Sequence, residues 1–177
     1  MMVFKERLAN ATKIGGPGVI VEVDEVKLES RKFNRGHRVE GAWVVNGIER
    51  TAQRRKFSVH VLSRDKQSLR RVIGENVEKG SIVFTDGWGG YFGISDACQV
   101  EHRTVNHSKH FKDPQTGTCT NTVEGMNRAF KSSVSPRHRT DESAPLMSAL
   151  YIWRDKNKNR LCDAFIDLLR ENLESNK

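Results

Sequence analysis

Runs of β-branched apolar residues fill the first half of the chain, and they constrain its fold more than any other feature. The first run, GVIVEVDEV, alternates well. Val21 and Val23 fall on one face of the expected strand, and Glu22 and Asp24 fall on the other. We therefore expect strands over 18–26, 39–49 and 57–63, the second of them folding back at its Asn46-Gly47 turn signal.

A helical pattern then interrupts the strands. In the segment 65–80, Leu69, Val72, Ile73 and Val77 recur at helical spacing and Gly80 follows as a stop signal. The remaining segments predict strands over 81–86 and 100–107 and helices over 121–133, from Pro145 onward, and over 161–173. This order predicts an α/β chain with a mixed sheet of about five strands, flanked by helices and followed by C-terminal helices. It resembles the ribonuclease-H-like fold.

Three carboxylates occupy special places in this order. Asp24 lies in the first strand, Asp86 ends the strand that follows the helix, and Glu124 begins the helix over 121–133. Acids that converge from two strands and a helix can hold two divalent metal ions for phosphoryl transfer. Each acid also has an alternative structural role that needs no metal. Asp24 would lie on a solvated strand face, and Asp86 would be a turn residue before glycine. Glu124 would form a capping box with Asn121.

The positive charge is concentrated in two segments. The chain has 30 Lys and Arg against 22 Asp and Glu, a net charge of +8. The segments 31–56 and 102–139 hold most of the excess. Glu124, Arg128 and Lys131 share one helical face, so a metal-binding acid would be followed by cations for phosphate. The surface is therefore suited to a nucleic-acid backbone, with a merely solvated basic face as the alternative.

Composition excludes several other classes. No apolar stretch reaches the roughly 18 to 20 residues that a membrane span needs. The N-terminus lacks an apolar core of signal-peptide length, so we do not expect secretion. The three cysteines are an odd and sparse set, which favours free thiols in a reducing compartment.

Several stretches together resemble the catalytic domain of the Merlin superfamily of DNA transposases and its ISXO-type bacterial insertion-sequence relatives. The matching text is GGPGVIVEVDEVKLESRKFNRGHRVEGAWVVNGIER, GSIVFTDGWGGY, TVNHSKHFKDPQTGTCTNTVEGMNRAFK and the pair Trp153-Arg154. The resemblance covers most of residues 15–154 in the order found in the family. It implies a DDE transposase domain that cuts and rejoins double-stranded DNA at transposon ends and targets.

The resemblance also implies roles for individual residues. The catalytic, metal-binding acids would be Asp24, Asp86 and Glu124, with Asn121 as an alternative third ligand. They would hold two Mg²⁺ ions, for which Mn²⁺ can substitute. Contacts to DNA are expected from Arg128, Lys131, Arg35, Arg38 and Lys109. A homodimer on DNA fits this family, in the nucleus of a eukaryote or otherwise in the cytoplasm.

The chain departs from the family pattern on both sides of the third acid. The family commonly has His where Cys119 stands and an aromatic residue where Asn127 stands. We expect a leader or remnant over 1–17, the DDE domain over 18–157 and a C-terminal helix over 158–177. We expect the family's amino-terminal DNA-binding segment to be missing, as in a truncated copy, a partial gene model or a domesticated remnant. Two alternatives to an active transposase follow: a DNA-binding relic without turnover, and a structure-selective nuclease of the same fold.

Overall fold

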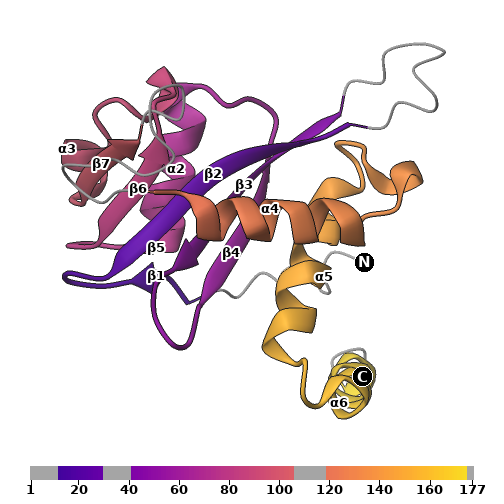
Figure 1. Cartoon of the computed structure of the whole chain (residues 1–177). Coiled ribbons are helices and arrows are strands. Elements are labelled where there is room, and N and C mark those ends of the chain that lie inside the picture. Colours follow the sequence, from indigo (N-terminus) through magenta and orange to yellow (C-terminus); the bar gives the residue numbers. More distant parts are fainter. Residues whose placement is uncertain (1–11, 30–40, 106–118, 175–177) are drawn as a thin grey trace, which may run out of the picture.

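The protein is represented by a computed structural model, which describes residues 12–29, 41–105 and 119–174. Figure 1 shows a twisted sheet crossed on one face by α4, with α2 on the other face. The strands are β1 (Ile14–Gly15), β2 (Ile20–Leu28), β3 (Ala42–Glu49), β4 (Lys56–Val61), β5 (Val77–Glu78), β6 (Ile82–Asp86) and β7 (Glu101–Val105). The helices are α2 (Lys66–Asn76), α3 (Ile94–Cys98), α4 (Asn121–Ser133), α5 (Ala144–Lys156) and α6 (Leu161–Glu174), with short 3-10 turns η1 (Gly89–Tyr91) and η2 (Pro136–His138).

The main sheet has five strands in the order β4-β3-β2-β6-β7. The β2–β3 and β3–β4 pairs are antiparallel, whereas β6 pairs in parallel with β2 and with β7. β1 pairs in parallel with β5 in a separate two-stranded sheet. The observed order confirms the predicted α/β arrangement with a mixed sheet, which is the ribonuclease-H-like fold.

One face of the sheet packs against α2. Val21 and Val23 of β2 share a hydrophobic cluster with Leu69, Val72 and Ile73 of α2. Every one of these side chains is fully buried. The valine face that the alternation predicted is therefore the face that forms this core.

The opposite face packs against α4 and α5. Leu28 of β2 and Val44 of β3 form a cluster with Phe130 of α4 and Ala144 of α5. A smaller cluster joins Ile48 to α4 and α5 through Val123, Met126 and Ile152. Since this second core covers the strand face that carries Glu22 and Asp24, those acids lie beneath a helix and not on an open surface.

The strand over 42–49 does not fold back at Asn46-Gly47. Both residues lie inside β3, opposite Asp24 and Val23 of β2. A Cβ atom at Gly47 would overlap the ring of Phe57, its partner on β4. The glycine is therefore required by close packing across the sheet, and the turn prediction was wrong.

The helix expected over 65–80 is shorter than its apolar spacing suggested. Asp65 caps α2 by accepting a hydrogen bond from the Ser68 amide at 2.8 Å. The helix ends at Asn76, and Val77 enters β5 opposite Ile14 of β1. Pairing with a strand far away in the sequence therefore overrides the helical periodicity at Val77.

The C-terminal helix α6 buries only part of its apolar stripe. Ala164 and Leu168 are buried, whereas the larger apolar side chains Leu161, Phe165, Ile166, Leu169 and Leu173 are 42–70% exposed. Within the described parts of the chain, we find no helix with the length and apolar character needed to cross a membrane.

Candidate active site

The two aspartates lie side by side on neighbouring parallel strands. Glu22 of β2 pairs with Phe84 of β6, and two residues further along these strands come Asp24 and Asp86. Asp86 is the last residue of β6. Because successive side chains alternate along a strand, both aspartates belong to the face that α4 covers.

The electrostatics show that the three acids share one region. Burial and, next in size, the negative charge of Asp86 raise the pKa of Asp24 from 3.8 to about 6. Glu124, in the first turn of α4, raises it further by a smaller amount. Charges from a neighbouring strand and from the helix α4 therefore both act on Asp24.

Both oxygens of Asp24 already accept a hydrogen bond. Oδ1 accepts from the backbone amide of Glu25 at 2.8 Å, and Oδ2 accepts from the side-chain amide of Asn127 at 2.8 Å. Each bond lowers the pKa of Asp24, which opposes the effect of burial. A carboxylate offers about four lone-pair positions, so acceptor capacity remains on both oxygens.

Asn127 is also the middle of a buried polar chain. Its Oδ1 accepts from Nδ2 of Asn46 at 2.6 Å, and Asn46 lies directly opposite Asp24 on β3. Asn46 and Asn127 are both buried. The side chain of Asp24 is thus held by an amide on α4, which is itself held by an amide on β3.

Glu22 anchors the start of α4. It is fully buried, and its Oε2 accepts from the backbone amides of Thr122 and Val123 at 2.8 and 2.9 Å. Its Oε1 accepts from Nε of Arg50 at 2.5 Å. These bonds satisfy two of the helix's N-terminal amides, and a buried carboxylate there is also stabilised by the helix dipole.

Arg50 extends this cluster to the segment before α4. Its Nη2 donates to the carbonyl oxygen of Cys119 at 2.8 Å and contacts the Sγ of Cys119 at 2.6 Å. The guanidinium also lies 5.1 Å from the centre of the Phe84 ring. Arg50 therefore ties β2, the end of β3 and the entry to α4 together.

Comparison of the sequence with known protein families identifies the family of this chain. The family described as ISXO2-like transposase domain matches residues 15–143, which include both aspartates and Glu124. The chain belongs to the ISXO2-like transposase domain family. No curated protein matches the chain.

DDE transposases of this kind generally use divalent metals, and the donor set of this domain suits them. Asp24, Asp86 and Glu124 supply only oxygen atoms, which Mg²⁺ and Mn²⁺ prefer. The repulsion that raises the pKa of Asp24 is the kind that a bound cation relieves. Among the described residues, no group of three or more His, Cys, Asp or Glu side chains is arranged so that it could hold a metal ion. Asp86 and Glu124 thus act electrostatically on Asp24, but the described residues form no closed metal ligand set.

The sequence left two roles open for Glu124: a metal ligand, or a partner of Asn121 in a capping box. In the transposase domain, Asn121 is the first residue of α4 and Thr120 is its N-cap, with no side-chain capping bond. The capping carboxylate comes instead from Glu22. Thr120 Oγ1 lies 3.4 Å from Oε1 of Glu124, and Arg128 lies 3.8 Å from its other oxygen.

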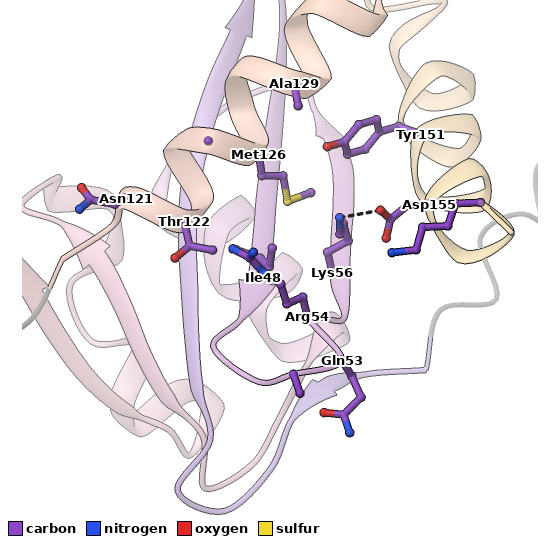
Figure 2. A pocket seen from close by; sticks show the side chains of 13 residues that line it. Ile48, Gln53, Arg54, Lys56, Asn121, Thr122, Met126, Ala129, Tyr151 and Asp155 are labelled. Carbon is purple, nitrogen blue, oxygen red and sulfur yellow. Dashed lines mark hydrogen bonds and ion pairs between the residues drawn. The ribbon is translucent and has the colours of Figure 1, made fainter.

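The predicted DNA contacts are only partly within the described residues. Arg128 is exposed and Lys131 is half-buried, both on α4. Arg35, Arg38 and Lys109 lie outside the described residues. The exposed Asn121 is among the residues that line a hollow between α4 and the β3–β4 connection, and Figure 2 shows it at the edge of this hollow.

Sequence reasoning missed Glu25, which lies next to Asp24 but on the opposite face. Its Oε2 accepts from the hydroxyl of the buried Tyr91 at 3.0 Å. Burial raises the pKa of Glu25 to about 7. The hydrogen bond from Tyr91 lowers this pKa, whereas the negative charges of Asp24 and Asp86 raise it further. Strand alternation places consecutive acids on opposite faces, so the signal was present in the sequence.

Proposed function

We propose that the chain catalyses metal-dependent cleavage of DNA strands and their transfer to a target, as in cut-and-paste transposition. The observation that carries the proposal is that Asp86, from the neighbouring strand β6, and Glu124, from α4, both act on Asp24 at the face of the sheet covered by α4. Because the chain belongs to a transposase family, we assign these acids to the cleavage and transfer of DNA strands. The partner is double-stranded DNA, with a homodimer as the acting unit, in whichever compartment holds that DNA.

Each side chain has a distinct task in this proposal. Asp24, Asp86 and Glu124 would hold the metal ions through their carboxylate oxygens. A pair of divalent ions, when bound, would acidify the attacking water and stabilise the leaving oxygen. Asn127 is a positioning residue, because its amide fixes Oδ2 of Asp24 while leaving lone pairs for a metal. Arg128 and Lys131 would hold the phosphates of the substrate.

The test is cleavage of a labelled duplex oligonucleotide with Mg²⁺ or Mn²⁺. Asp86→Asn should abolish cleavage, because it removes a ligand charge from the centre. Glu75→Gln is the matched control, because Glu75 is exposed on α2 at the other face of the sheet. A variant Asp86→Asn with undiminished cleavage would refute the proposed centre.

Two alternatives have observations in their favour. A DNA-binding relic is favoured by the hydrogen bonds that already occupy Asp24 and by the lack of a closed metal ligand set in the described residues. It predicts salt-dependent DNA binding without cleavage. A structure-selective nuclease would cut and not join, so the formation of joined products separates it from a transposase.

A further inference from the structure

A basic groove lies beside α4. It has a volume of about 440 Å³ and is bounded by the β3–β4 connection, α4 and α5. Figure 2 shows Arg54 extending from that connection toward the end of α4 that carries Thr122. Its lining includes the residues on which the charge and shape of the groove depend: Arg54, Lys56, Gly125, Ala129, Asp155 and Lys158.

A second hollow of about 260 Å³ continues this groove along α5. The two share the cations Arg54, Lys56 and Lys158. The second adds Arg55 and Lys156. We use the term basic groove for the two hollows together.

The positive charge of the basic groove is only partly neutralised. Asp155 is the single acid among the described residues that line it, and it pairs with Lys56 at 2.8 Å. Arg55 pairs with the buried Glu49. Arg54 and Lys158 are exposed, and no ion pair joins either to a carboxylate within the described part of the chain.

The floor of the basic groove allows a polymer backbone to approach α4 closely. Gly125 and Ala129 line it from the helix, and a Cβ atom at Gly125 would meet no atom within 4 Å. The small residues Gly125 and Ala129 leave room for a phosphodiester backbone, and the long cationic side chains of the groove can reach its phosphates. Because polar groups and charges line the hollow, it is poorly suited to an apolar ligand.

We propose that the basic groove binds the phosphodiester backbone of a DNA strand, with Arg54 and Lys158 as its main contacts. The proposal rests on the proposed function and adds to it a path for the substrate. Asn121 lines the groove, and Glu124 follows it in the same helical turn. A strand that leaves the carboxylates across the first turn of α4 therefore enters the groove. An acidic protein segment is negatively charged like DNA, but it is not the substrate of the proposed reaction at the neighbouring carboxylates.

The test is the salt dependence of DNA binding, measured by fluorescence anisotropy of a labelled duplex oligonucleotide without divalent metal. Each phosphate contact adds about 0.9 to the slope of log affinity against log salt. The double variant Arg54→Gln/Lys158→Gln should therefore lower the slope by about 2 and weaken binding at low salt. Arg71→Gln is the matched control, because Arg71 is exposed on α2 and should leave the slope unchanged.

The outcomes separate the groove from the catalytic proposal. If the wild-type protein binds DNA and the double variant keeps its slope, the groove is refuted while the proposed function stands. If the slope falls as expected but no cleavage occurs with Mg²⁺ or Mn²⁺, the groove stands and the catalytic proposal fails. Equal displacement of the DNA by polyglutamate, or no DNA binding by the wild-type protein, would overturn the groove. Circular dichroism of both variants checks that these exposed substitutions leave the fold intact.

Discussion

Replacing Arg50 by alanine should destabilise the protein strongly, because it removes the charge partner of a buried carboxylate. Glu22 is fully buried, and its side chain is bonded to Arg50 at 2.5 Å. Removing one partner of a buried ion pair typically costs about 3–5 kcal/mol. Glu22 keeps its bonds to the Thr122 and Val123 amides, so we expect the lower end, about 3 kcal/mol.

Urea unfolding at pH 7 measures this loss directly. The midpoint should fall while the slope of free energy against urea stays the same, because the surface exposed on unfolding does not change. For a chain of this size the melting temperature should fall by about 6–12 °C. The control is Arg103→Ala, which breaks the exposed pair with Glu101 and should cost less than about 1 kcal/mol.

A double-mutant cycle identifies the cause. In Arg50→Ala/Glu22→Gln the buried charge is gone, so the double variant should be more stable than Arg50→Ala alone. An Arg50→Ala loss below about 1 kcal/mol would refute the idea that Glu22 depends on Arg50. A double variant less stable than Arg50→Ala would show that the Glu22 carboxylate stabilises the fold even without Arg50, through its bonds to the Thr122 and Val123 amides.

Three further predictions concern the acids around the site. The pKa of Glu25 is raised to about 7, so the folded protein binds a proton at Glu25 more tightly than the unfolded chain does. The free energy of unfolding should therefore fall by about 2–3 kcal/mol as pH rises from 4.5 to 7. Glu25→Gln should remove this fall in urea unfolding at pH 5 and pH 8, and an unchanged fall would contradict it. Asn127→Leu should weaken Mn²⁺ binding roughly 10- to 100-fold in calorimetry, because Asp24 loses its positioning amide; equal affinity would show that the bond positions nothing. Asp86→Asn should stabilise the metal-free protein at pH 8 by relieving repulsion of Asp24, yet abolish the thermal shift caused by Mg²⁺; a retained shift would place the metal elsewhere.

The strand pattern in the sequence predicted the sheet well because a period of two is a local property. It separated Val21 and Val23 from Glu22 and Asp24, and the structure keeps that separation. The pattern could not show that the polar face is buried, since the covering helix α4 begins about a hundred residues later in the chain. A contact across that distance has no local signature.

Local signals were misleading where tertiary packing decides the conformation. The dipeptide Asn46-Gly47 is typical of a tight turn, yet each residue is needed for a contact across the sheet or beneath the helix. Gly47 makes room for the Phe57 ring, and Asn46 donates to Asn127. The sequence identified Asn127 only as a departure from the family, and the structure shows the bond to Asp24 that this departure creates.

The position of the third acid depends on Glu22 and Asn127, neither of which is a proposed ligand. Glu22 holds the amide of Val123, and Asp24 holds the side chain of Asn127, one helical turn further on. Positions four apart lie on the same face of a helix, so these two bonds fix both the depth of α4 and its rotation about its axis. Glu124 directly follows Val123, and its direction is set by that rotation. A change at Glu22 would therefore move the third carboxylate without touching it.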